Sequence, residues 1–120
     1  MPLLLALVLI AACTTDLRGT RLRLETAASQ PGLACDGAAA APVRIERDDD
    51  ELVFVDVGSK ERRTIIWPFG FAAWLEYGRA VLYARDGEVV GREGDVLDKI
   101  GGGADAAGFH VCQVGDRTYS

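Results

Sequence analysis

Residues 79–93 read R-A-V-L-Y-A-R-D-G-E-V-V-G-R-E, two apolar runs separated by Asp86-Gly87. An Asp-Gly pair between two such runs is a strong β-hairpin signal, because these residues tolerate the left-handed backbone that a tight turn requires. The stretch therefore predicts two antiparallel strands, over residues 79–84 and 88–93.

Similar short runs lie on both sides of this hairpin. Residues 43–47 alternate between apolar and charged side chains, residues 52–57 are rich in β-branched and aromatic ones, and the acidic turn between them predicts a second hairpin. Residues 71–77 fit either a strand or one helical turn. Further strands are expected over residues 21–26, 63–67, 96–100 and 109–114, with Gly101-Gly102-Gly103 as a flexible turn that breaks the chain.

The regular spacing of these strands indicates the fold class. Strands recur about every eight to twelve residues and no long helix is predicted, which is typical of sandwiches and small barrels. We therefore expect an all-β domain, either an antiparallel barrel of roughly five to seven strands or a sandwich.

Composition limits the size and the partners. The chain has 120 residues, enough for one domain, with 49% hydrophobic and 26% charged residues. Lys and Arg number 13 against 18 Asp and Glu, so the net charge is −5. A groove for nucleic acid needs clustered positive charge, so we expect no nucleic-acid partner.

The N-terminal residues indicate export. Residues 1–12 are uncharged and almost wholly apolar, too few for a membrane span of about 20 residues but typical of a signal peptide. Ile10-Ala11-Ala12-Cys13 resembles the bacterial lipobox, which implies cleavage before Cys13 and a diacylglycerol on its sulfur. A conventional secretory signal and a buried N-terminal element are the alternatives.

This resemblance implies three segments and a location. Residues 1–12 form the signal peptide, residues 13–19 a lipid-anchored tether, and residues 20–120 a single β domain. The anchor would hold the protein at the cell membrane, facing the extracytoplasmic side. The membrane is then a partner through the lipid alone, because no basic cluster follows Cys13.

The three cysteines fit an exported protein. Lipidation uses Cys13, and an oxidising compartment would tend to pair the remaining two, Cys35 and Cys112. The alternative is two buried free thiols. A redox pair is disfavoured because no C-x-x-C spacing exists.

Four stretches of the domain follow one another in a characteristic order. They are Ile66-Trp67-Pro68-Phe69-Gly70-Phe71, Asp86-Gly87-Glu88-Val89-Val90-Gly91-Arg92-Glu93-Gly94-Asp95, Gly101-Gly102-Gly103 and Cys112. Their order resembles that of small OB-like β-barrel domains in secreted and lipid-anchored proteins of actinobacteria and related bacteria. The resemblance covers residues 43–119 and implies a fold and a location rather than a reaction.

An aromatic cluster is the strongest candidate site. Five of the nine aromatic residues lie within residues 67–77. Rings on a barrel face are a common way for OB-like modules to hold sugars or flexible chains, so we predict a binding patch. The alternative is that all these rings belong to the core, as we expect for Trp67. The predicted patch consists of Phe69, Phe71, Trp74 and Tyr77.

Other motifs predict no chemistry. Asp48-Asp49-Asp50-Glu51 does not match a calcium loop, and the G-x-G-x-x-A pattern at residues 101–106 lacks the βαβ unit of a dinucleotide site. His110 is the only histidine, and none of the three serines, Ser29, Ser59 and Ser120, lies in a G-x-S-x-G elbow. We therefore predict no catalytic residue, metal or cofactor.

These observations favour a non-enzymatic cell-envelope lipoprotein that binds an envelope protein or glycan. One alternative is a structural or accessory envelope subunit with no ligand. The other is a small envelope hydrolase that acts through His110.

Overall fold

The computed structural model describes residues 19–28 and 38–119. Within these ranges the chain forms thirteen short strands and no helix, so the predicted all-β class is confirmed while five to seven strands was too few. The signal peptide, Cys13 and Cys35 lie outside the described residues. No helix in the described part is long and apolar enough to cross a membrane.

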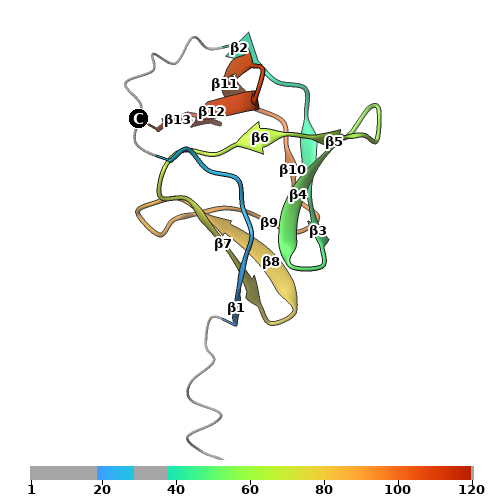
Figure 1. Cartoon of the computed structure of the whole chain (residues 1–120), viewed down its shortest axis with the longest axis vertical. Helices are drawn as coiled ribbons and strands as arrows, with labels where there is room; N and C mark the ends of the chain where they lie inside the picture. The colour runs from blue at the N-terminus through green and yellow to red at the C-terminus, as the bar shows by residue number, and fades with distance from the viewer. Residues whose placement is uncertain (1–18, 29–37, 120) are drawn as a thin grey trace, which may run out of the picture.

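Three sheets make up the domain (Figure 1). The first has the order β1 (Thr20–Leu22), β7 (Ala72–Glu76), β8 (Arg79–Tyr83), β9 (Val89–Arg92). The second has the order β10 (Val96–Leu97), β3 (Val43–Asp48), β4 (Glu51–Asp56), β5 (Arg62–Arg63). The third has the order β13 (Arg117–Thr118), β12 (Gly108–Val114), β11 (Ile100–Asp105), β2 (Ala38–Ala39), and β6 (Ile65–Ile66) also pairs with β12.

All these pairings are antiparallel except that of β6 with β12, which is parallel. We expected one strand over residues 63–67. The chain instead passes from one sheet to another there, because β5 pairs with β4 whereas β6 pairs with β12. The expected strand over residues 96–100 is likewise divided between β10 and the start of β11.

Tight turns connect the hairpins where the sequence predicts them. The β3–β4 turn contains Asp49 with φ 56°, and the β8–β9 turn contains Gly87 with φ 90°. Residues 71–77, which fitted a strand or a helical turn, form strand β7 and the start of its turn. That turn, Tyr77-Gly78, has positive φ at both residues, the type I′ geometry that matches the twist of a two-residue hairpin.

The expected break at Gly101-Gly102-Gly103 is wrong, because all three glycines lie within β11. A side chain at Gly102 would place its Cβ 1.9 Å from the backbone oxygen of His110. Glycine here therefore permits close approach of two strands rather than a flexible turn. A bulge between Gly101 and Gly102 accompanies this contact.

One hydrophobic core joins the three sheets. It contains Leu82 from the first sheet, Ile45 and Phe54 from the second, and Val111 from the third. Trp67 follows β6 and is fully buried. The three sheets therefore share one interior (Figure 1).

Candidate functional site

The aromatic residues near Trp67 begin in the core. Trp67 is 0% exposed, its ring lies 5.1 Å from that of Phe54, and it stacks on Phe71 with centroids 5.8 Å apart. Phe71 is 3% exposed and meets Tyr119 edge-on, with centroids 4.9 Å apart. The expectation that Phe71 belongs to an exposed patch is therefore wrong, because Trp67 and Tyr119 cover its ring.

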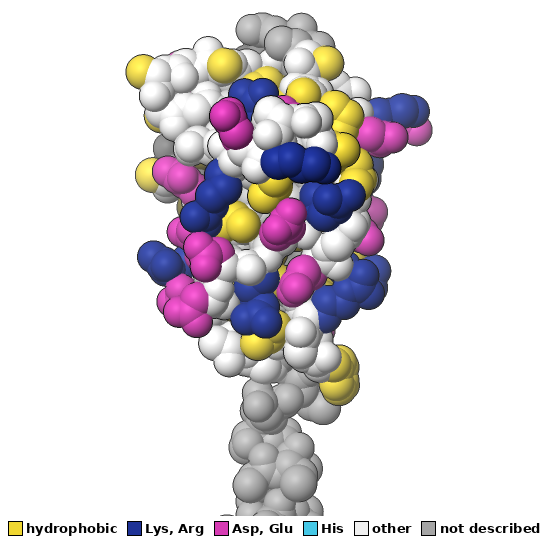
Figure 2. Space-filling model, turned by 90° about the vertical axis from the view of Figure 1, so that its right-hand side faces the viewer, with side chains coloured by type: hydrophobic (Ala, Val, Ile, Leu, Met, Phe, Trp, Pro, Cys, Tyr) yellow, Lys and Arg dark blue, Asp and Glu magenta, His cyan; other side chains and the backbone are white. Residues whose placement is uncertain are grey.

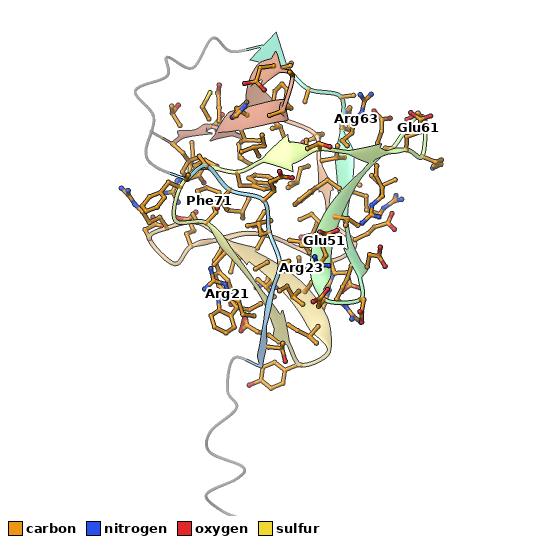
Figure 3. The ribbon with its side chains drawn as sticks, in the orientation of Figure 1. Arg21, Arg23, Glu51, Glu61, Arg63 and Phe71 are labelled. Atoms are coloured by element: carbon orange, nitrogen blue, oxygen red, sulfur yellow. The ribbon has the colours of Figure 1, made fainter. Side chains whose placement is uncertain are left out.

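Trp74 lies on the outer side of the first sheet. Its neighbour Ala73 is fully buried, so the alternation of side chains along β7 turns Trp74 away from the core. The guanidinium of Arg21, its partner across the β1–β7 pair, lies 5.4 Å from the centre of the Trp74 ring. Arg21 is labelled low on β1 in Figure 3, whereas Phe71 lies higher, near the start of β7.

Tyr77 and Phe69 are the two exposed rings of the predicted patch. Tyr77 is 93% exposed at the tip of the β7–β8 hairpin, and Phe69 is 44% exposed in the turn before β7. The two rings therefore lie beyond opposite ends of the same strand. The structure does not gather Phe69, Phe71, Trp74 and Tyr77 into one patch.

Phe69 is held at the tip of a tight turn. The N–H of Phe71 donates to the Pro68 oxygen at 3.2 Å, and Gly70 between them has φ 90°. A four-residue turn with a left-handed third residue is typical of type II. A side chain at Gly70 would come within 2.6 Å of Arg85, so glycine also lets Arg85 pack against the turn.

A groove of about 180 Å³ opens beside this turn. It lies between the turn, the end of the β8 segment and the C-terminal residues after β12. Its walls combine three aromatic rings with charged and hydroxyl groups. The lining residues are Pro68, Phe69, Phe71, Ala84, Arg85, Asp86, Arg117, Thr118 and Tyr119.

Ion pairs fix the charged wall of the groove. Arg117 lies 3.0 Å from the carboxylate of Asp86, pairs also with Glu88, and stands 5.5 Å from the centre of the Tyr119 ring. The hydrogen bond to Asp86 raises the pKa of Arg117 above its ordinary value, so the guanidinium stays charged. The groove therefore offers a cation, a carboxylate and an exposed ring within one small space.

The backbone positions Tyr119 for this role. Its N–H donates to the Cys112 oxygen at 2.6 Å, which extends the pairing of β12 with β13. Sequence reasoning did not identify Tyr119, Arg117 or Asp86 as site residues. Only the fold brings residues 117–119 beside the turn at Pro68, so no local pattern marks them.

A larger hollow of about 520 Å³ adjoins β2 and the β11–β12 hairpin. As in the groove at Phe69, its two charged residues are paired, Arg63 with Asp56 at 2.8 Å and Asp105 with His110 at 2.9 Å. The ring in its wall, Phe109, is half-buried against the core. This hollow therefore lacks the exposed aromatic ring that distinguishes the groove at Phe69.

The acidic run 48–51 lies in the β3–β4 hairpin and is paired with arginines. Asp50 lies 3.0 Å from Arg23, while Asp48 and Glu51 lie 3.2 and 3.1 Å from Arg62. In the described ranges, no group of three or more His, Cys, Asp or Glu residues is placed to hold a metal ion. Positive and negative side chains are interspersed over the face shown in Figure 2.

The single histidine pairs within the β11–β12 hairpin. Nε2 of His110 lies 2.9 Å from Asp105. The pKa of Asp105 is lowered, mostly by the hydrogen bond from the Ala107 N–H and next by the hydrogen bond from His110. Ser59 lies in the turn after β4, where its Oγ accepts from the Glu61 N–H at 3.3 Å. Ser29 and Ser120 lie outside the described residues.

Asp56 is a buried carboxylate that sequence reasoning missed. It is 5% exposed and accepts hydrogen bonds from the N–H groups of Gly58 and Ser59 at 2.8 and 2.9 Å. The pKa of Asp56 is lowered to about 2, mostly by the hydrogen bond from the Ser59 N–H and next by the hydrogen bond from Arg63. These bonds hold the turn after β4, so Asp56 acts in the structure rather than in the groove.

Comparisons with known proteins find no matching family model, no matching curated protein and no matching solved structure. The groove at Phe69 is therefore interpreted from its own geometry.

Proposed function

We propose that this protein is a non-enzymatic cell-envelope lipoprotein, anchored through Cys13, whose β domain binds an envelope glycan in the groove at Phe69. The observation that carries the proposal is the 44% exposed ring of Phe69 beside the paired charges of Arg117 and Asp86. An aromatic face packs against the apolar side of a sugar ring, while charged groups bond to its hydroxyls.

The size of the groove supports one sugar ring rather than a whole ligand. Its volume of about 180 Å³ lies below the roughly 300–1,000 Å³ of sites that enclose a drug-sized molecule. A chain of sugars could pass through, with one ring on Phe69 and the rest in solvent. A polysaccharide therefore fits better than a free small molecule.

The proposal also includes two features predicted from the sequence, the architecture of the domain and a disulfide. The proposed architecture is an OB-like barrel or a sandwich, supported by three mainly antiparallel sheets around one core. A Cys35–Cys112 disulfide would tie the segment before β2 to β12. Cys112 lies half-buried in β12, with its sulfur 3.7 Å from the Gly101 oxygen.

Co-sedimentation with insoluble cell-wall polysaccharide tests the binding function. Phe69→Ala is expected to weaken retention on the order of tenfold, because one stacked ring is lost. Val96→Ala is the matched control, since Val96 on β10 is also 44% exposed. Unchanged retention of Phe69→Ala, or no retention of the wild type, would instead favour a protein partner or a subunit with no ligand.

Intact mass tests the anchor and the disulfide together. Protein purified from native membranes should lack residues 1–12, carry a lipid-sized gain, and rise by two hydrogen masses on reduction. An unprocessed chain with three free thiols would contradict both the anchor and the disulfide.

A further inference from the structure

The tip of the β7–β8 hairpin holds a residue that its backbone does not favour. Tyr77 has φ 51° and is 93% exposed. The left-handed region is uncommon for bulky residues, and Asn-Gly or Asp-Gly is the usual choice in a type I′ turn. A strained residue that contacts so little of its own domain suggests a role outside that domain.

The tip lies where the chain enters the domain. β1 pairs with β7 from Thr20 opposite Leu75, so the start of β1 lies next to the last residues before the turn. A Cβ on Gly19 would lie only 1.9 Å from the Leu75 oxygen, which shows how closely the chain follows β7 at this point. Figure 1 shows the β7–β8 turn and the start of β1 together at the lower end of the molecule.

The proposed anchor lies a short distance along the chain. Cys13 precedes Gly19 by six residues, and six residues span at most about 20 Å when extended. A lipid on Cys13 would therefore keep this end of the domain close to the bilayer. The groove at Phe69 lies beyond the opposite end of β7.

The chemistry of the tip suits a membrane surface. Tyrosine is enriched at bilayer interfaces, where its amphipathic ring lies at the level of the headgroups with its apolar part toward the acyl chains. Arg79 directly follows the turn with its side chain 55% exposed; it donates to the Glu93 carbonyl oxygen at 3.0 Å and lies 4.0 Å from Asp95. Arg21 lies on β1, with its guanidinium 5.4 Å from the centre of the Trp74 ring. Both arginines are within reach of lipid phosphates behind the ring, and Arg79 would exchange its long contact with Asp95 for a phosphate.

We propose that the Tyr77-Gly78 turn contacts the membrane, with the Tyr77 ring inserted at the boundary between headgroups and acyl chains. This inference rests on the proposed lipid anchor. It orients the domain with the Tyr77 end toward the bilayer and the Phe69 groove away from it, where a cell-wall glycan could reach it.

Quenching by brominated lipids tests the contact. The full chain, produced and processed in bacterial membranes, is reconstituted into vesicles of phosphatidylethanolamine and phosphatidylglycerol with brominated acyl chains. Tyr77→Trp adds a fluorophore at the tip, and Phe69→Trp adds one at the other end of β7 as the control. Subtracting the wild-type emission removes the contribution of Trp67 and Trp74.

Most of the emission added by Tyr77→Trp should be quenched, whereas that added by Phe69→Trp should persist. Flotation of the vesicles separates the two proposals. A chain that floats with the vesicles but shows no quenching at Tyr77→Trp, or equal quenching at both positions, would overturn the membrane contact and leave the anchor standing. A chain that does not float would overturn the anchor, and this inference with it.

Discussion

Aromatic rings near the two ends of strand β7 differ sharply in their exposure to solvent. Before the strand, Trp67, Phe71 and Tyr119 pack in contact, and two of these rings are almost fully buried. After the strand, Tyr77 is 93% exposed in a turn that disfavours it. Trp67 and Tyr77 are only ten positions apart, yet the first is fully buried in the core and the second is almost wholly in solvent.

The largest expected effect on stability comes from the buried aromatic rings before β7. Phe71→Ala should lower the free energy of unfolding by about 3–5 kcal/mol, because it leaves a cavity between Trp67 and Tyr119. Phe69→Ala, two residues away, should cost about 0.5 kcal/mol or less, because that ring is largely in solvent. Guanidinium unfolding followed by circular dichroism measures both.

Similar losses for the two variants would contradict this division, since they would mean that Phe69 also belongs to the core. If Phe71→Ala does not fold, Phe71→Leu keeps most of the volume and should lose less. The difference between the Phe69 and Phe71 variants, rather than either value alone, tests the comparison.

Carboxylates in the molecule also differ in their exposure to solvent. Asp56 is 5% exposed with its pKa lowered from 3.8 to about 2, whereas the Asp105 side chain is 60% exposed. A lowered folded pKa stabilises the protein above the unfolded value. That stability is lost as pH falls from about 4 toward 2.

Thermal unfolding between pH 7 and pH 2 measures this effect. Asp56→Asn should lower the Tm at pH 7 by several degrees, because it removes the charge that Arg63 pairs with at 2.8 Å. Its Tm should also fall less than that of the wild type below pH 4. Asp105→Asn is the matched control and should change both quantities less; parallel pH curves for wild type and Asp56→Asn would contradict the assignment.

Local turn chemistry made much of this fold predictable. Asp86-Gly87 and Asp48-Asp49-Asp50 predicted the hairpins β8–β9 and β3–β4, because such residues accept the backbone angles of tight turns. The alternating run 109–114 likewise predicted β12 almost to the residue. Elements that are determined by residues adjacent in the chain could therefore be predicted from the sequence.

Long-range packing was not predictable. The triple glycine reads as a turn, because nothing near it reveals that the His110 backbone approaches Gly102. Phe69 and Phe71 look equivalent until Tyr119, from the far end of the chain, covers one of them. The groove is formed by such contacts, so the sequence predicted two of the three aromatic residues that line it, Phe69 and Phe71, and none of its charged groups.

The smallest expected effect on stability comes from the exposed end of β7, at Tyr77. Here a substitution should raise the free energy of unfolding rather than lower it. Tyr77→Asn should raise the free energy of unfolding by about 1 kcal/mol, because asparagine enters the left-handed region at lower cost than a bulky residue. The ring removed is 93% exposed, so little packing is lost. Guanidinium unfolding of the domain in solution, away from any membrane, measures the gain.

Tyr77→Ala shows whether that gain arises in the backbone. Alanine removes the exposed ring but keeps a Cβ that resists φ 51°, so it should stabilise less than asparagine. Equal gains from both variants would mean that the exposed ring, not the backbone angle, causes the instability. A gain confined to Tyr77→Asn would mean that the native tyrosine lowers the stability of the domain, which is the cost expected where a residue is kept for contact with a membrane.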